Sequence, residues 1–178
     1  MRLHLVSLVF VVCALPLISP AGEKADHPLK KAKIGDYAVY TNTASENGKD
    51  SESVTVKKTV VARSDKDVTV RVEITAGGKT VQKNDNKIDL TKPYDPIAEM
   101  TAPGQKWEKI ANGKEKIKIG AKSYDCTWIS GKGTDAKKIE YEFKIWTDMS
   151  VPFGVVKMET KAADFKLRHE LIESGSAK

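Results

Sequence analysis

Few residues of this chain have the types and spacing that catalysis needs. After residue 21 there are two histidines, His27 and His169, and one cysteine, Cys126. His169 stands between Arg168 and Glu170, a setting more typical of a solvated or cross-strand pair than of a general base. The chain contains no Gly-x-Ser-x-Gly elbow, phosphate loop, dinucleotide glycine pattern, His-Glu-x-x-His motif or paired cysteines. The sequence therefore predicts a non-enzymatic protein without a cofactor; a dyad of His169 with a distant carboxylate is the residual enzymatic alternative.

Metal binding is not expected. Residues 84–86 read Asn-Asp-Asn and supply the carboxylate and amide oxygens that Ca²⁺ prefers. A calcium loop needs further oxygen ligands at fixed spacing and a later glutamate, and these do not follow here. We therefore interpret residues 84–86 as a surface turn that ends a strand.

The cysteine is expected to be structural. Cys126 stands two residues from Tyr124 and two from Trp128, which places the three side chains on one side of a strand. A free cysteine in a core usually acts as a small buried apolar residue. Because no second cysteine follows residue 21, we expect no intramolecular disulfide.

A row of lysines is the clearest charge pattern. Lys114, Lys116 and Lys118 alternate with other residues, so three ammonium groups share one face of a strand. Such a row could meet anionic lipid head groups, with each basic residue contributing about 1 kcal/mol. The alternative is that the three lysines lie on the solvent-exposed face of a sheet and pair with carboxylates such as Glu140 or Glu142. The formal net charge of +6 is otherwise spread along the chain, so we expect no nucleic-acid binding.

The elements that position these residues are expected to be β-strands. In the stretch 137–160, Ile139, Tyr141, Phe143 and Ile145 alternate with charged residues, which puts the apolar side chains on one face of a sheet. Trp146 is out of phase, so we expect the strand to bend or a connection to dock there. Similar patterns predict strands over 34–41, 54–62, 68–75, 79–83, 107–110, 114–119, 124–130, 155–160 and 165–173.

Turn signals join these strands into a meander. Asn112-Gly113 accepts the positive φ angles of a tight hairpin turn, so we expect a reversal there. Residues 91–105 are the least strand-like part, and Asp95 before Pro96 fits an N-cap with proline at the first helical position. This predicts one short helix over 96–101 as a lid. The fold class is therefore mainly β, an antiparallel meander of roughly ten strands in a curved sheet or unclosed barrel.

The N-terminus has the pattern of a secretory signal peptide. Arg2 precedes an apolar run from Leu5 to Leu17 that ends in small residues, and Pro16 makes the run too short for a membrane span. We expect residues 1–21 to be removed, leaving no transmembrane segment and a periplasmic or secreted protein. The expected organisation is a flexible leader over 22–33, a single β domain over 34–173 and a disordered tail over 174–178.

Aromatic residues define the candidate ligand site. Most of them fit the packed interior of a sheet, but the same side chains could line an apolar pocket in a barrel mouth. The candidate ligand-binding residues, with none catalytic and none binding metal, are Tyr94, Ile97, Met100, Tyr124, Trp128, Tyr141, Phe143 and Phe153.

A family resemblance rests on three motifs: Gly-x-x-x-Tyr-Asp-Cys over 120–126, then Trp146, then Val-Pro-Phe-Gly-Val-Val-Lys-Met-Glu over 151–159. This combination resembles exported bacterial proteins of unassigned function with a LolA-like fold, the lipoprotein-carrier superfamily. The resemblance covers residues 113–173 and, more weakly, 34–40. It implies a strongly curved antiparallel sheet with a helical lid over an apolar concavity, and carriage of a lipid or acylated partner.

Two functional classes follow from these observations. The first is an exported non-enzymatic β domain that binds a hydrophobic ligand or acyl chain, with residues 93–104 and 149–154 at the mouth of the site. The second is an envelope structural or protein-interaction module, bound to an envelope protein, whose interior is fully packed. An apolar pocket of several hundred Å³ would favour the first class.

Overall fold

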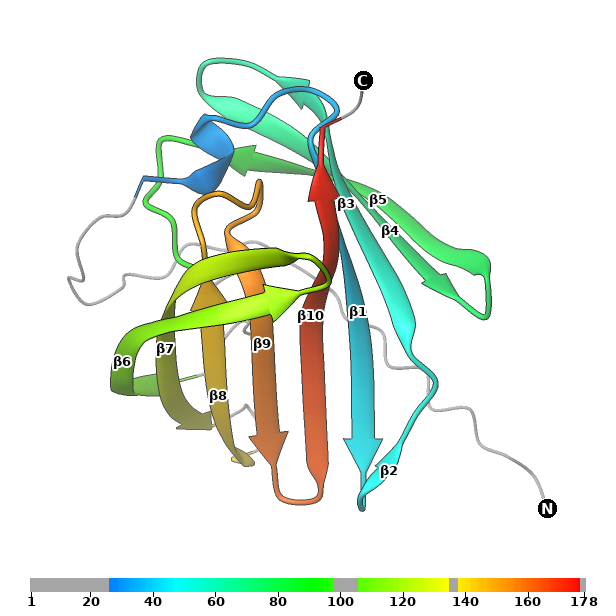
Figure 1. The fold of residues 1–178 in the computed structure, drawn as a ribbon, viewed down its shortest axis with the longest axis vertical. Helices are drawn as coiled ribbons and strands as arrows, with labels where there is room; N and C mark the ends of the chain where they lie inside the picture. Colours follow the sequence, from blue (N-terminus) through cyan, green and yellow to red (C-terminus); the bar gives the residue numbers. More distant parts are fainter. Residues whose placement is uncertain (1–25, 98–105, 135–137, 177–178) are drawn as a thin grey trace.

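One open antiparallel sheet makes up almost the whole structure (Figure 1). The computed structural model describes residues 26–97, 106–134 and 138–176, so the expected signal peptide lies outside the described residues. The strand order is β5-β4-β3-β1-β10-β9-β8-β7-β6, and the short β2 pairs with β1. The elements are η1 (Pro28–Lys30), β1 (Tyr37–Glu46), β2 (Lys49–Asp50), β3 (Val54–Arg63), β4 (Asp67–Ala76), β5 (Lys79–Asp89), β6 (Lys106–Ile119), β7 (Lys122–Thr134), β8 (Glu140–Thr147), β9 (Val155–Ala162) and β10 (Phe165–Gly175).

The prediction of an antiparallel meander in a mainly β protein is confirmed. The chain enters and leaves the sheet at its centre, because β1 lies beside β10. The two free edges are β5 and β6, which do not pair with each other, so the sheet is not closed. The predicted short helix is not confirmed. Residues 96–97 form a turn, residues 98–101 lie outside the described residues, and the helical structure in the described part of the chain is limited to the 3-10 turn η1.

The β6–β7 hairpin gives the sheet its strongest bend. Its last pair with β8 joins Thr127 to Thr147, and the rest of the hairpin continues past the end of β8. Figure 1 shows this distal half crossing in front of β9 and β10. A register shift between Trp146 and Thr147 in the β8–β9 pair marks a bend in the strand at the position expected from the sequence.

The predicted hairpin turn at Asn112-Gly113 is wrong. Both residues lie inside β6, and the chain reverses at Gly120 and Ala121 instead. Gly113 is opposite Trp128 in the register, and a Cβ at Gly113 would lie 2.8 Å from the indole ring. The glycine is therefore needed to let the ring lie over the backbone of the neighbouring strand.

The predicted break at residues 84–86 is also wrong, because β5 runs through them to Asp89. Asp85 is directly opposite Arg71 on β4, and the guanidinium Nε and Nη2 donate to its two carboxylate oxygens at 2.8 and 2.9 Å. This bidentate cross-strand pair keeps a poor strand former in the sheet.

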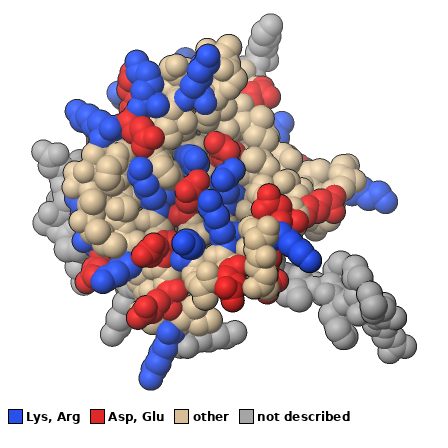
Figure 2. All heavy atoms as spheres, turned by 60° about the horizontal axis from the view of Figure 1, so that its bottom comes forward, with Lys and Arg blue, Asp and Glu red and all other residues tan. Residues whose placement is uncertain are grey.

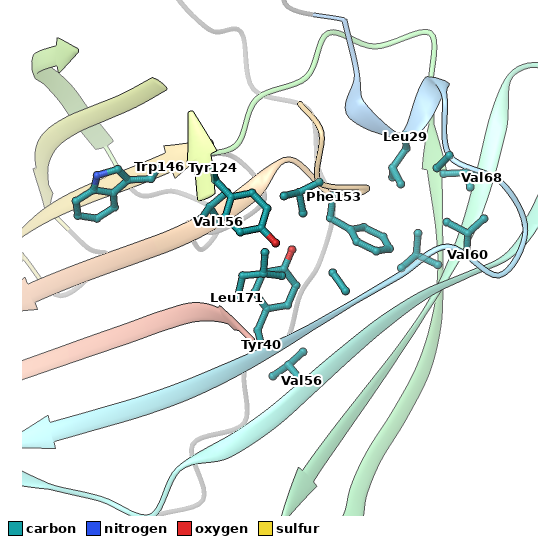
Figure 3. Packing of buried hydrophobic residues seen from close by; sticks show 14 of the residues in the cluster. Leu29, Tyr40, Val56, Val60, Val68, Tyr124, Trp146, Phe153, Val156 and Leu171 are labelled. Carbon is teal, nitrogen blue, oxygen red and sulfur yellow. The ribbon is translucent and has the colours of Figure 1, made fainter. Parts of the chain in front are cut away.

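Two hydrophobic clusters fill the interior. The small cluster is formed by Ile97, Tyr141, Phe143, Ile145 and Met158, with Trp107, Ile129, Ala162 and Leu167 packed against it. The large cluster is formed by Leu29, Ala32, Ala38, Tyr40, Val56, Val60, Val68, Val70, Leu90, Tyr124, Cys126, Trp146, Val151, Phe153, Val156 and Leu171. Figure 3 shows Tyr124, carried by the hairpin, beside Val156 and directed toward Tyr40. Ile139, predicted to share the buried face of β8, is 48% exposed and lies before the strand begins.

The described part of the predicted leader, residues 26–33, packs against the core. The sequence predicted little fixed structure over 22–33, but Pro28, Leu29 and Ala32 are buried. Arg63 at the end of β3 holds this segment, because its guanidinium donates to the carbonyl oxygens of Leu29, Ala32 and Lys30 at 2.7, 2.6 and 2.5 Å. The contact is non-local, and for this reason the local pattern does not reveal it.

Replacing Arg63 with alanine should release residues 26–33 from the sheet. Three backbone carbonyls would each lose a hydrogen bond from a charged donor. Each lost hydrogen bond destabilises the packing of the segment by about 1.5–3 kcal/mol at most. We expect limited trypsin digestion to cut faster after Lys30, Lys31 or Lys33 in Arg63→Ala than in the wild type. Arg71→Ala removes an exposed guanidinium from the same half of the sheet and should leave these cuts unchanged. Equal rates of trypsin cleavage within residues 26–33 in Arg63→Ala and Arg71→Ala would contradict a role of Arg63 in holding this segment on the sheet.

Residues 174–176 of the predicted tail continue the contacts of β10. The tail was predicted to begin at residue 174, but Ser174 and Gly175 belong to β10. Ser176 donates a hydrogen bond to the buried Asp36, and Tyr37 donates to Glu173. These contacts tie the end of β10 to the start of β1.

Candidate functional site

A hollow lies at the end of the small cluster. It is a groove of about 660 Å³ between the ends of β6, β7, β8 and β9. Its apolar lining comes from Trp107, Tyr141 and Ala162, and its charged rim from Glu108, Lys132, Glu140, Glu142 and Lys161. We call this hollow the groove. A smaller hollow of about 440 Å³ lies beside the β1–β2 turn and includes Ala44 and Phe165.

Aromatic rings form the floor of the groove. Trp107 meets Phe143 edge to face, with ring centroids 5.7 Å apart, and Tyr141 lies 6.3 Å from Phe143. Phe143 is opposite Gly131 on β7, where a Cβ would lie 2.5 Å from its ring. Because Gly131 has no side chain, the tip of the Phe143 ring can lie close against β7.

The rim carries charges of both signs. Lys132 forms an ion pair with Glu108 at 3.1 Å, and the hydrogen bond with Glu108 raises the pKa of Lys132. Lys161 is opposite Glu142 in the β8–β9 register. In the face drawn in Figure 2, basic and acidic side chains are interleaved in the same way. The groove thus combines an apolar floor with a polar entrance, an arrangement suited to an amphipathic molecule.

The predicted ligand-binding residues are divided between the two clusters. Ile97, Tyr141 and Phe143 come together in the small cluster. Tyr124 and Phe153 belong to the large cluster, and Trp128 packs against it. Tyr94 is half-buried beside Phe153, and Met100 lies outside the described residues. The structure therefore brings three of the candidates together in the small cluster, and of these Tyr141 lines the groove.

At the predicted mouth of the ligand site, the side chains of the described residues pack against one another. The Tyr94 hydroxyl donates to the carbonyl oxygen of Phe153 at 3.2 Å, and the Tyr94 ring lies 5.1 Å from the ring of His27. Phe153 is 3% exposed, and a Cβ at Gly154 would lie 2.7 Å from the Tyr94 hydroxyl oxygen. Residues 93–97 and 149–154 do meet, as expected from the sequence. They meet as a packed cover that also includes η1 (Figure 1).

Trp107 and Ala162 line the groove and were not among the candidates. Trp107 lies one residue after the start of β6, and Ala162 is the last residue of β9. Each belongs to a strand end, where a two-residue period gives little information. A tryptophan at the start of an edge strand was the one signal that could have found this end of the sheet.

His169 is buried rather than solvated. Its ring stacks on Tyr40 with centroids 4.3 Å apart, and its Nδ1 is hydrogen-bonded to the amide oxygen of Asn42, the residue directly opposite on β1. Because an amide oxygen only accepts, Nδ1 carries the proton, and Nε2 is buried without a partner among the described residues. Burial, together with the nearby ammonium of Lys58, lowers the pKa of His169 to about 3. The cross-strand pair expected for His169 is present, but it joins a neutral imidazole to the neutral amide of Asn42.

Cys126 is buried with 1% of its surface exposed, as the sequence predicts. Burial raises the pKa of its thiol to about 11, and the carboxylates of Asp148, Glu115 and Asp125 act in the same direction. The thiolate that would react is therefore scarce at neutral pH. This supports a structural role for the cysteine.

Trp146 anchors the hairpin to the sheet. Its Nε1 donates to Glu115 on β6 at 2.8 Å, and the same carboxylate oxygen accepts from Lys144 at 3.2 Å. The Lys144 ammonium lies 4.2 Å from the centroid of the Trp128 ring and 4.4 Å from that of Trp146. The hydrogen bonds from Trp146 and Lys144 lower the pKa of Glu115.

No family model matches the chain, and no curated protein matches it. Within residues 26–97, 106–134 and 138–176, no helix is long and apolar enough to cross a membrane. The same residues contain no group of three or more metal-binding side chains.

Proposed function

We propose that this chain is an exported, non-enzymatic β domain that binds a hydrophobic ligand or acyl chain in the groove. The observation that carries the proposal is a hollow of about 660 Å³ whose lining includes the aromatic rings of Trp107 and Tyr141. This volume is within the usual range of small-molecule sites, which combine apolar walls with a few polar groups. The resemblance of residues 113–173 to LolA-like proteins favours the same class of ligand. We further propose that residues 1–21 are removed on export to the periplasm or the medium.

Groove binding is tested with a fluorescent fatty acid and a variant that fills the site. Ala162→Phe places a ring in the groove on the β9 side of Tyr141, so we expect the affinity for the probe to fall at least ten-fold. Ala44→Phe makes the same change beside the smaller hollow and should leave the affinity unchanged. Circular dichroism confirms that both variants fold. Uptake that is blocked by Ala44→Phe and not by Ala162→Phe would contradict the groove as the site.

A second function is supported by the packing around Phe153. In the cover formed by Tyr94, Phe153 and η1, the described residues of the predicted mouth pack against one another. This packing favours an envelope structural or protein-interaction module. Under this function the wild-type protein takes up no fatty acid, and pull-down from an envelope extract recovers a protein partner.

A further inference from the structure

The distal half of the β6–β7 hairpin has two distinct faces. Ile117 and Ile119 on β6, with Tyr124 and Cys126 on β7, face inward and contact the large cluster. The alternate residues of both strands therefore face away from the core. They are all exposed: Lys114, Lys116, Lys118, Ser123, Asp125 and Thr127.

The outward face is basic and is nearly without counter-charge. In the register Lys114 is opposite Thr127, Lys116 opposite Asp125 and Lys118 opposite Ser123. Lys116 forms an ion pair with Asp125 at 3.3 Å, but both side chains are largely exposed, so water screens the pair. Lys114 and Lys118 make no ion pair with any residue that the structure describes.

The acidic residue of the segment is directed to the other face. Glu115 is hydrogen-bonded to Trp146 and Lys144 on the sheet, so its charge does not neutralise the lysine row. The outward face of the hairpin therefore carries three lysines against the single carboxylate of Asp125.

We propose that this lysine row, Lys114, Lys116 and Lys118, docks the protein on an anionic phospholipid surface. Alternate residues of a strand are about 7 Å apart, so the three ammonium groups form a straight row on a hairpin that Trp146 fixes to the sheet. A bilayer offers negative charge continuously along such a row, and each lysine strengthens partitioning about five-fold. A nucleic acid is a poorer fit, because typical binding uses 6–10 phosphate contacts.

The test is sedimentation of the protein with vesicles of neutral phosphatidylcholine or of phosphatidylcholine with 30% phosphatidylglycerol. We expect binding to the anionic vesicles that is lost at high salt. Lys114→Thr/Lys118→Thr should weaken it about thirty-fold, and Lys114→Arg/Lys118→Arg should restore it. The control Lys79→Thr/Lys92→Thr removes the same number of positive charges near the β5 edge of the sheet. It should have little effect on binding to the anionic vesicles.

Several outcomes would overturn the docking proposal. Equal binding to neutral and anionic vesicles, or equal weakening by the row variant and the control, would show that the row is not the contact. Binding to heparin without binding to anionic vesicles would replace the lipid surface with another polyanion. The docking does not depend on a ligand in the groove, so it can fail while the proposed function stands.

Discussion

Gly131→Ala should lower the free energy of unfolding by about 3 kcal/mol, at the upper end of the usual cost of overpacking. A Cβ at this position would lie 2.5 Å from Cζ of Phe143 and 2.6 Å from the carbonyl oxygen of Glu108. The Phe143 ring could turn aside, but the carbonyl belongs to the backbone of β6 and can move only with the strand. We therefore expect the β6–β7 pairing and the groove to distort together. Urea unfolding followed by tryptophan fluorescence measures the effect.

Gly78→Ala is the matched control. Gly78 has a φ of +75°, and no atom lies within 4 Å of a Cβ built there. Its substitution costs only the left-handed backbone conformation, about 1 kcal/mol. In the Gly131→Ala background, Phe143→Leu relieves the ring contact and not the carbonyl contact, so recovery should be partial. Similar losses in Gly78→Ala and Gly131→Ala would contradict the close approach of Phe143 and Glu108 to Gly131.

The second large effect is acid destabilisation through His169. Its pKa is about 3 in the folded protein and near 6.5 in the unfolded chain. The stability that neutral His169 contributes is therefore complete above pH 6.5 and is lost as the pH falls toward 3. The loss is about 1.4 kcal/mol per pH unit below 6.5, or roughly 3 kcal/mol at pH 4.

Chemical denaturation at pH 7 and pH 4 tests this effect in the wild type and in His169→Gln. Carboxylates with lowered pKa values, such as Glu115 and Asp85, also destabilise the fold in acid. They remain in the variant, so the difference between the two proteins isolates the histidine. We expect the variant to be less stable at pH 7 but to lose much less stability between pH 7 and pH 4. Equal losses in both proteins would show that His169 is not held neutral by burial.

The strands were predictable because their information is local. Tyr141, Phe143 and Ile145 alternate with charged residues, and the structure buries all three in β8. The position of Cys126 between Tyr124 and Trp128 likewise predicted its burial. At these positions the alternation of apolar and polar residues, together with the burial of one face of the sheet, determines the structure.

The errors come from contacts between residues far apart in the chain. Asn112-Gly113 has the local signal of a turn, but Trp128 on β7 needs the missing side chain of Gly113. Asp85 is kept in β5 by Arg71, and the N-terminal segment is kept in the core by Arg63. None of these partners lies within the window that a local pattern covers.

The candidate site was partly predictable for the same reason. Tyr141 and Phe143 were identified from the alternation in β8; Tyr141 lines the groove, and Phe143 packs with it in the small cluster. Trp107 and Ala162 were missed because the groove arises where four strands end together. The location of the groove depends on the residue at which each strand ends. The turn signals in the sequence predicted these ends less well than the alternation of residues predicted the strands.

Native mass spectrometry of the protein purified from its own host tests the proposed ligand binding most directly. We predict a bound species heavier than the polypeptide by the mass of a lipid or acylated molecule, and loss of that species in Ala162→Phe. A spectrum with only the mass of the polypeptide, together with no uptake of a fluorescent fatty acid, would contradict the proposal and favour a packed interaction module.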